Sequence, residues 1–511
     1  MRIIRKRLFL QIPLHMYIVI FLCITSFIFR AYRLQDRLFW EGDQARDLLI
    51  SYQIAQGKVF PMIGATAVGF QTIFFYPPYY YYLLALFSYI SKDPLVIASI
   101  FVLIQSLATT LMFGIGKHYG NVLMGIVLAI FYTFSSQMIT QGSNIGSLYL
   151  MPVLFLLGLL ITRKSISSNS VSPKLALGYF FLILSTTFHY SSSIFVFFLW
   201  CYDIFNLLKK RHYHEVILFC VFTWLIVLIL YSPLVSQFGF PTVAQYFSPN
   251  ANMSIQGNYF KTLWYHHATS WSYVFENNHY APILFIALCF SLITQRSQKK
   301  RIIIFLSPWF MMIELFLWII SFRRGGPLPT WNYLLLYSIY LVLFSSVCTI
   351  FLKNIHRLSK FFGIIVFFVI LFFLTDNFNL MTWGTKMYTN KMTIAKTIIK
   401  DAQKRKDFPN IYITAGMPGS GVGFESYAYW YFVEAAHKGF IYYNPTKHLL
   451  EQANTKNSPH YLICQSAKTY EEECKRVFAR QYNGLRFDQS IESPVEDTTI
   501  NLFVPINNTK L

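Results

Sequence analysis

Long uninterrupted apolar segments constrain this chain more than any other feature of its sequence. Of its 511 residues, 55% are hydrophobic and only 13% are charged, whereas an average soluble domain carries about 25% charged residues. The apolar residues fall in blocks of roughly 16–22, the length at which a helix crosses the hydrocarbon core of a bilayer, about 30 Å thick. The sequence therefore predicts an α-helical polytopic membrane protein.

These blocks predict about 11–13 transmembrane helices. Eleven of them can be placed, over 12–30, 95–116, 121–139, 147–162, 174–188, 191–207, 215–233, 280–295, 301–321, 331–351 and 360–376. The first block is too long for the apolar part of a signal peptide and no small-residue cleavage site follows it, so we expect it to be retained. The apolar segment 76–90 contains the aromatic run Tyr79–Tyr82, and we expect it to form a helix in the headgroup zone.

Lysine and arginine residues near the spans orient the chain, because they collect on cytoplasmic loops. Residues 2–7 are mostly basic, which places the N-terminus in the cytoplasm. The first loop 31–94, the long loop 234–279 and everything after 376 are then extracytoplasmic. The basic linkers fall inside, at 163–174, 209–214, 295–301 and 353–360. In a plasma (inner) membrane, this pattern and the net charge of +21 imply anionic membrane lipids as partners and no nucleic acid.

The chain changes character after Asp376, where the long apolar runs stop. We expect a transmembrane domain over 1–376, whose outer loop 31–94 carries the chemistry, and a soluble extracytoplasmic α/β domain over 377–511. The second domain has a plausible size for one core. It should contain amphipathic helices at 387–406 and 470–482, and short strands at 411–414, 461–464 and 501–504. The glycine-rich segment 416–423 lacks the pattern of a phosphate-binding loop and is expected to be a flexible loop.

Cys464 and Cys474 are the only cysteine pair in the 377–511 domain. In an oxidising compartment they could form a disulfide that closes a short loop, and two free thiols are the alternative. No Cys/His spacing resembles a zinc site, and we expect His266 and His267 to be ordinary loop residues. No nucleotide-binding loop occurs in the sequence.

A cluster of acids follows the first span. Glu41, Asp43 and Asp47 lie within or directly after the segment Phe39–Arg46, in a chain with 43 Lys and Arg but only 22 Asp and Glu. Acids held at a membrane surface between aromatic and apolar neighbours are expected to take a proton, hold a metal ion or bind a cationic group.

Nucleotide-activated donors are absent outside the cytoplasm, so a transferase acting there needs a donor that the membrane carries. A polyprenyl-phosphate sugar meets this need. Its phosphate must be held by cations, and its acceptor must lose a proton to a base. The outer acids of this chain offer the base, and Arg323 and Arg324 offer outer cations.

The chain resembles the GT-C glycosyltransferase superfamily, in particular bacterial protein mannosyltransferases and lipid A aminoarabinose transferases. The resemblance rests on a first span followed by Phe39-Trp40-x-x-Asp43-x-x-Arg46, and about thirty residues later on Phe75-Tyr76-Pro77-Pro78. It covers the first 150 residues in detail and the remainder in layout. It implies an integral-membrane glycosyltransferase that moves a hexosyl or pentosyl group from a lipid-phosphate donor to a lipid, glycan or protein, inverting the anomeric carbon.

The resemblance also implies roles for single residues. Asp43 matches the family's first-loop Asp, which acts as a base or as the partner of a divalent cation such as Mg or Mn. Gln44 stands where many relatives carry Glu, and Tyr76 stands where a basic residue or His often precedes the proline pair. Asn144 lies in the second outer loop, where relatives often carry an acid, and could orient a substrate. The candidate substrate-binding residues are Glu41, Gln44, Arg46, Tyr76, Asn144, Glu314, Arg323 and Arg324.

The first-loop candidates have structural alternatives. Asp43 could cap a helix that begins near Gln44, a position that Asp suits well. Arg46 could pair with Asp43 or Asp47 on one helix face, rather than hold a donor phosphate. Lys58 is a further candidate for the phosphate.

The later candidates have alternatives too. Glu314 lies inside the span 301–321, where a lone acid costs roughly 2.5–3.5 kcal/mol. It should therefore face the bundle interior, as a hydrogen-bond hub or as part of a cavity. Arg323 and Arg324 could instead anchor the chain to lipid headgroups.

Two other functions compete with transfer. A lipid or polysaccharide transporter would show internal repeats and charged residues along a midplane path, and we find no convincing repeat. A non-catalytic membrane scaffold would keep the fold without the activity. Dependence on a divalent cation, or hydrolysis of the donor by purified protein, would separate a transferase from both.

Overall fold

A computed structural model shows how these segments are arranged. The residues that it describes are 13–68, 73–166, 172–240, 259–275, 311–319, 335–343, 345–346, 349, 386–405, 409–414, 429–432, 441–444, 449–452, 459–465, 467–482, 485–496 and 498–505. The chain falls into two compact units. The first comprises Met1–Tyr32, Met62–Tyr80 and Ser99–Leu380, and the second comprises Arg33–Pro61, Tyr81–Ala98 and Met381–Leu511.

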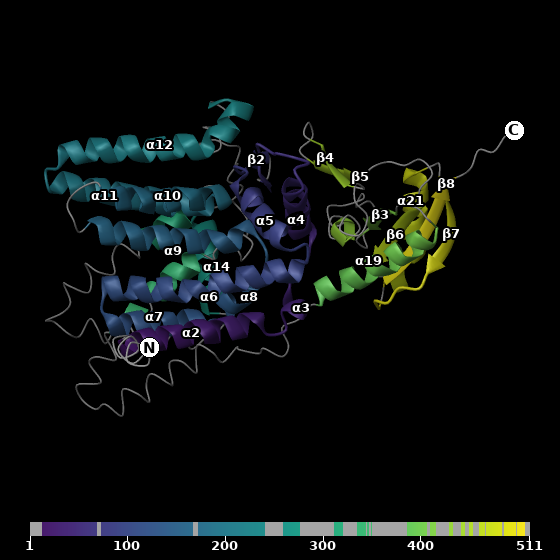
Figure 1. Ribbon diagram of the computed structural model, residues 1–511, viewed down its shortest axis with the longest axis horizontal. Coiled ribbons are helices and arrows are strands. Elements are labelled where there is room, and N and C mark those ends of the chain that lie inside the picture. The colour runs from purple at the N-terminus through teal and green to yellow at the C-terminus, as the bar shows by residue number, and fades with distance from the viewer. Residues whose placement is uncertain are drawn as a thin grey trace, which may run out of the picture. The chain divides into compact units, whose positions relative to one another are not determined.

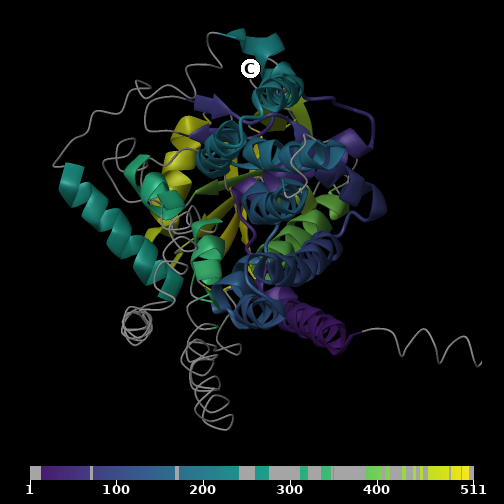
Figure 2. The ribbon, with the colours of Figure 1, turned by 90° about the vertical axis from the view of Figure 1, so that its left-hand side faces the viewer.

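Most helices of the first unit run side by side (Figure 1), and Figure 2 looks along the axes of these helices. Its helices are α2 (Leu14–Ala31), most of α6 (Pro94–Tyr119), α7 (Val122–Phe134), α8 (Ser136–Gln141), α9 (Ser147–Ile166), α10 (Pro173–Phe188), α11 (Ser191–Lys209), α12 (Tyr213–Phe238) and α14 (Tyr259–Phe275). Among the described residues, α2, α6, α9, α11 and α12 are long and apolar enough to cross a membrane. The predicted polytopic helical architecture is confirmed.

Apart from 121–139, the spans predicted up to residue 233 coincide with α2, α6 and α9 to α12 within a few residues. The predicted spans 280–295 and 360–376 lie outside the described residues. The other two are described only in part, and 311–319 and 335–343 are helical.

The span expected over 121–139 is not one helix. It breaks at Ser135, whose backbone is extended and whose hydroxyl accepts a hydrogen bond from the Met138 N–H at 3.2 Å. This cap satisfies a backbone donor that would otherwise be orphaned at a helix start. The length of an apolar segment does not reveal such a break, because the segment is largely apolar on both sides of it.

The region 234–279, expected to be a loop, is also different. It contains the end of α12 and all of α14, and both His266 and His267 lie on α14. This helix mixes polar and aromatic residues, so it does not stand out as an apolar run.

Small residues allow close approach of neighbouring helices. At the crossing of α9 and α10, a Cβ added to Gly158 would lie 2.7 Å from the carbonyl oxygen of Gly178. Such backbone proximity is how membrane helices gain van der Waals contact where no hydrophobic force drives them together. On the other side of the bundle, α2 packs on α7 through Val19, Leu22 and Ala129, with Phe113 of α6. A short hairpin of β1 (Thr66–Val68) and β2 (Ile73–Phe75) completes the described part of this unit.

A buried ionic cluster joins α9, α10 and α11. Arg163 donates to both carboxylate oxygens of Asp203, at 2.7 and 2.5 Å, and the Tyr179 hydroxyl donates to the same carboxylate at 2.6 Å. The side chain of Asp203 is only 2% exposed. Asp203 is thus a second acid within a span, and it satisfies its charge inside the bundle.

We predict that Asp203→Leu lowers the free energy of unfolding by about 3–5 kcal/mol, because it leaves the Arg163 guanidinium buried without its carboxylate. The double variant Arg163→Met/Asp203→Leu should lose less than the single variant, since it removes both charges. Thermal and denaturant unfolding of the detergent-solubilised protein measures both. A single variant as stable as the double variant would contradict a structural ion pair.

The second unit is an α/β structure. Its helices are α3 (Leu34–Arg37), α4 (Gly42–Ala55), most of α5 (Tyr79–Ile90), α19 (Met387–Lys404) and α21 (Ala467–Gln481). Its four-stranded sheet has the order β3 (Asn410–Thr414), β6 (His460–Gln465), β8 (Thr498–Pro505) and β7 (Leu485–Ile491). Strand β6 pairs in parallel with β3 and antiparallel with β8, and β7 pairs antiparallel with β8. A separate antiparallel pair is formed by β4 (Ile441–Asn444) and β5 (Leu449–Gln452).

The helices predicted at 387–406 and 470–482 are present, as are the three predicted strands. Strands β4, β5 and β7 were not predicted. In β7 the central residues are exposed and mostly polar, because it is an edge strand. Such a strand gives little of the apolar alternation by which strands are found.

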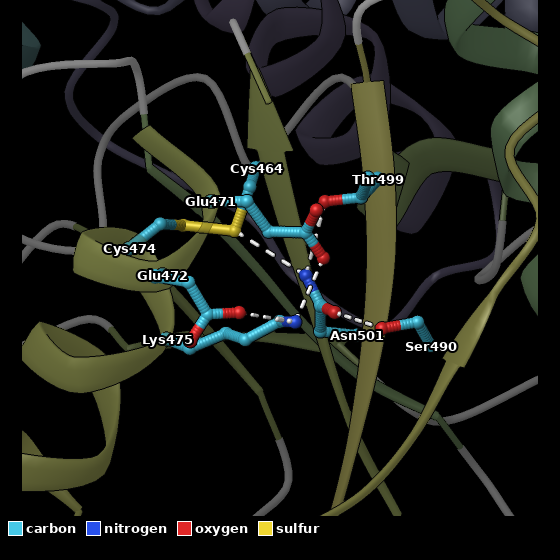
Figure 3. Close-up of a disulfide and its surroundings, with 8 residues drawn as sticks. All are labelled: Cys464, Glu471, Glu472, Cys474, Lys475, Ser490, Thr499 and Asn501. Atoms are coloured by element: carbon cyan, nitrogen blue, oxygen red, sulfur yellow. Dashed lines mark hydrogen bonds and ion pairs between the residues drawn. A yellow bond between two sulfur atoms is a disulfide. The ribbon is translucent and has the colours of Figure 1, made fainter. Parts of the chain in front are cut away.

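A disulfide fastens α21 to the sheet. Cys464 on β6 and Cys474 on α21 are bonded, with an S–S distance of 2.07 Å (Figure 3). Of the two alternatives that the sequence left open, a disulfide and two free thiols, the structure has the disulfide. Beside it, Asn501 Nδ2 donates to Cys464 Sγ at 3.5 Å, and Lys475 contacts two glutamates of its own helix. The core around the disulfide consists of Tyr412, Leu462, Phe478 and Phe503.

The loop after the first span is anchored in this second unit by Trp40. The indole is fully buried and makes edge contacts with the rings of Tyr388 and Tyr431, at 5.6 and 5.4 Å between centroids. The Tyr431 hydroxyl donates to the carbonyl of Lys92 at 2.7 Å, and the N–H of Lys386 donates to the carbonyl of Asp36 at 3.0 Å. The motif residue Trp40 is therefore part of a hydrophobic core.

Helix α5 has 12 residues and is roughly 18 Å long, which is too short to cross a hydrocarbon core of about 30 Å. Leu84 is buried, whereas Leu86, Tyr89 and Ile90 are exposed. The length and the exposed apolar residues agree with a helix that lies at the membrane surface.

Candidate functional site

The acidic segment after the first span forms the start of α4. The helix begins at Gly42 and Glu41 is its N-cap. The capping box is complete, because the Glu41 side chain accepts from the N–H of Gln44 and Gln44 Oε1 accepts from the Glu41 N–H at 3.2 Å. The alternative in which Asp43 caps the helix is therefore wrong: the helix starts two residues earlier than expected, and the cap falls on Glu41.

This cap separates the roles of neighbouring candidates. The side chains of Glu41 and Gln44 each accept a hydrogen bond from the other residue's backbone N–H. The Asp43 side chain, by contrast, is 63% exposed. Asp43 is thus the carboxylate of this helix start that faces solvent.

Arg46 holds two carboxylates at once. Its Nη1 lies 2.9 Å from Asp43 Oδ1, and its Nε and Nη2 lie 2.9 and 2.6 Å from Asp47 Oδ1. The side chains of Arg46 and Asp47 are only 11% and 8% exposed. The pairing that the sequence offered as an alternative to phosphate binding is present, and it involves both acids.

The cluster is electrostatically asymmetric. Burial raises the pKa of the Asp47 carboxyl to about 6. The Arg46 guanidinium and a hydrogen bond with Tyr81 work against this rise, and the negative charge of Asp43 adds to it. Asp47 therefore exchanges its proton near neutral pH.

The same cluster does not suit a divalent cation. Among the described residues, no group of three or more His, Cys, Asp or Glu side chains could hold a metal ion. Asp43, the expected metal partner, is bound to the Arg46 guanidinium, whose charge repels a cation. Mg²⁺ and Mn²⁺ bind best to carboxylate, carbonyl and water oxygens, so the residues at the start of α4 do not form such a site.

Tyr76 lies in the first unit and is largely buried. Its ring stacks on those of Tyr190 and His189, at 4.6 and 5.9 Å between centroids. Its carbonyl accepts from the Gly64 N–H at 2.7 Å, and a Cβ at Gly64 would lie 2.6 Å from the carbonyl oxygen of Pro77. The Tyr-Pro-Pro segment is therefore tightly packed against its neighbours.

Asn144, between α8 and α9, is buried, and its Nδ2 donates to the carbonyl of Thr140 at 3.1 Å. Its neighbour Ser143 donates to the carbonyl of Arg30 at 3.0 Å. The fully buried Arg30 guanidinium in turn donates to the carbonyl of Tyr132 at 3.4 Å and lies 5.1 Å from the centre of that ring. Sequence reasoning missed Arg30, although a basic residue in the last turn of an apolar helix could have marked it.

Glu314 is exposed, so the expectation that it faces the bundle interior is wrong, and it has a partner in the first unit. His267 Nε2 lies 3.3 Å from Glu314 Oε2, and the two side chains are 33% and 49% exposed. The pairing joins the helical segment 311–319 to α14. Glu314 was a candidate from the sequence, whereas His267 was expected to be an ordinary loop residue.

Three further cationic candidates came from the sequence: Lys58, Arg323 and Arg324. Lys58 lies exposed in the turn that follows α4. Arg323 and Arg324 lie outside the described residues.

An apolar cavity of about 470 Å³ lies in the first unit between α10, α11 and α12. Its walls include Val196, Trp200, Trp224, Val227 and Tyr231. The volume falls in the range of small-molecule and cofactor sites, about 300–1,000 Å³.

We predict that Glu41→Ala destabilises α4 by about 1 kcal/mol, because the first turn loses its cap, and that Glu41→Asp does not, since Asp is a preferred N-cap. Thermal unfolding of the purified variants measures the difference. If Glu41 acts through its cap alone, Glu41→Asp keeps activity. A stable Glu41→Asp variant without activity would instead point to a substrate contact.

Known proteins resemble this chain in structure but not in sequence. No family model and no curated protein matches the sequence. The structure is similar to ArnT from Cupriavidus metallidurans bound to undecaprenyl phosphate, with a TM-score of 0.53 and 10% identity over 95% of this chain and 97% of that chain. It is also similar to the archaeal oligosaccharyltransferase AglB from Archaeoglobus fulgidus in complex with an inhibitory peptide and a dolichol-phosphate, with a TM-score of 0.48 and 10% identity over 93% of this chain and 72% of that chain. The chain is an integral membrane protein, and its fold is similar to that of ArnT.

Proposed function

We propose that the protein is a membrane glycosyltransferase, which moves a sugar from a polyprenyl-phosphate donor to an extracytoplasmic lipid, glycan or protein. The observation that carries this proposal is the exposed Asp43 carboxylate, held by Arg46 on the first loop after the first span of a GT-C fold. ArnT, whose fold is similar to that of this chain, has been solved with undecaprenyl phosphate bound. That ligand belongs to the same chemical class as the proposed leaving group.

The proposed reaction is a single displacement. Asp43 takes the proton from the acceptor hydroxyl or amine, and the acceptor atom attacks the anomeric carbon. The bond from this carbon to the phosphate oxygen breaks, and its electron pair leaves with polyprenyl phosphate. Attack from the side opposite the phosphate inverts the anomeric carbon. Asp43 then gives its proton to water.

The leaving phosphate needs positive charge. Arg46 already serves two carboxylates, so Arg323 and Arg324 are the preferred candidates for this role. Gln44, Tyr76, Asn144 and Glu314 stay proposals for contacts with the sugar or the acceptor. We do not assign a step to a divalent cation.

The donor tail also needs an apolar path. The cavity between α10, α11 and α12 has the apolar lining and the volume to take part of an isoprenoid chain. We propose that it does so.

We place the second unit outside the cytoplasm, in a plasma (inner) membrane with a cytoplasmic N-terminus. The Cys464–Cys474 disulfide supports this side, because disulfides persist in oxidising compartments and are rare in the cytosol.

Asp43→Asn should lower kcat by at least about 100-fold with little effect on protein amount, since a general base contributes roughly 10²–10⁴ in rate. The donor would be the lipid-linked sugar fraction extracted from cells that lack the protein. Mass spectrometry of that fraction, before and after incubation with purified protein, follows its consumption.

Asp36→Asn is the matched control, because Asp36 also pairs with an arginine on this loop, Arg33, at 2.8 Å. It should keep wild-type turnover. Wild-type turnover by Asp43→Asn would remove Asp43 from the mechanism. No transfer by the wild-type protein with any such fraction would favour a transporter or a scaffold.

Val227→Trp should raise the KM for a long-chain donor about tenfold. The indole would fill the cavity, so the donor tail would lose apolar contacts that contribute roughly 1.4 kcal/mol to its binding free energy. It should change the KM for a short-chain donor much less. Val221→Trp is the control, since Val221 lies on the same helix, is 54% exposed and does not line the cavity. Equal effects of the two variants would exclude the cavity as the tail site.

A further inference from the structure

Asp47 and Tyr81 are buried near Arg46, whereas Asp43 is exposed to solvent. Asp47 makes two contacts with the guanidinium, through Nε and Nη2, and Asp43 makes one, through Nη1. The Asp47 side chain is 8% exposed and Tyr81 is 3% exposed, against 63% for the Asp43 side chain. The buried Asp47 therefore orients the guanidinium through Nε and Nη2. The exposed Asp43 contacts the remaining nitrogen, Nη1.

The spacing of α4 explains this division. Asp43 and Asp47 are four residues apart, so their side chains lie on one face of the helix, one turn from each other. Arg46, three residues after Asp43, reaches between them. The turn that carries Asp47 is further fixed by Ser51, whose hydroxyl donates to the Asp47 carbonyl at 2.6 Å.

We propose that Asp47 and Tyr81 are positioning residues for Asp43: Tyr81 holds the Asp47 carboxylate, Asp47 orients Arg46, and Arg46 holds the Asp43 carboxylate in place. This inference rests on the proposed function of Asp43 as the base. It gives two residues outside the predicted site a definite role in the rate of transfer.

The charges of the cluster support the same role. The single positive charge of Arg46 lies between two carboxylates, 2.9 Å from Asp43 Oδ1 and 2.6 Å from Asp47 Oδ1. When Asp43 takes the proton of the acceptor, as proposed, the buried guanidinium keeps the Asp47 carboxylate as its partner and is not left buried without a counter-charge.

The groups that face Asp47 are Arg46 and Asp43 on α4 and Tyr81 on α5. Burial raises the pKa of Asp47 to about 6, so this carboxylate is protonated below that pH and loosens its hold on Arg46. We therefore expect transfer to fall as the pH drops through about 6. Because this pKa is raised above the ordinary value of 3.8, protonation there favours the folded state. Unfolding through this group does not explain the loss.

The test is the pH dependence of kcat for four purified proteins: wild type, Asp47→Asn, Asp47→Glu and Tyr81→Phe. Asp47→Asn imitates the protonated form, so kcat should be roughly 100-fold lower at all pH values, with KM little changed and no step near pH 6. Asp47→Glu should restore part of the rate. Tyr81→Phe should move the step to higher pH, because it removes a hydrogen bond that lowers the pKa of Asp47.

Each outcome decides the inference. A wild-type rate and an unchanged step in Asp47→Asn would overturn it, and so would an unmoved step in Tyr81→Phe. If Asp47→Asn does not fold, Tyr81→Phe decides alone. Failure of the proposed function looks different, since transfer would then be absent in the wild type or insensitive to Asp43→Asn. Asp36→Asn should leave the step in place, because its pair with Arg33 lies outside the cluster.

Discussion

A charged side chain that leaves water must find its partner inside the protein, and this requirement organises the polar residues of the chain. Arg163 of α9 meets it with the carboxylate of Asp203 on α11. Arg30, buried at the end of α2, meets it with backbone carbonyls. Arg46 meets it with two acids, only one of which is buried. The exposed acid of that cluster is held in place by a charge that the buried acid has already oriented.

The loop after the first span is not folded by its own residues alone. Trp40 fills a core made with Tyr388 and Tyr431, which lie about 350–390 residues further along the chain. A loop of this length could not bury enough apolar surface to fix its own structure. The aromatic residue of the motif therefore packs in a core, while the acid of the motif, Asp43, stays exposed.

A fold does not by itself assign a reaction, because one fold can carry many functions. Similarity to ArnT at 10% identity establishes the arrangement of the chain and leaves the chemistry to particular side chains. Those side chains are an exposed carboxylate with a fixed guanidinium, a closely packed Tyr-Pro-Pro segment and an apolar cavity within the bundle. The proposed function rests on these side chains, each taken within its own unit.

The sequence determined what depends on local composition. Apolar length marked the spans from α2 to α12, and amphipathic periodicity marked α19 and α21. It could not place the N-cap of α4 on Glu41, or find α14 and β7, since a cap depends on geometry and the other two lack a strong apolar pattern. Only the tertiary structure brought Tyr81 to Asp47 and joined Cys464 to Cys474. These contacts depend on how separate segments pack, and side-chain packing in three dimensions leaves no periodic trace along the chain.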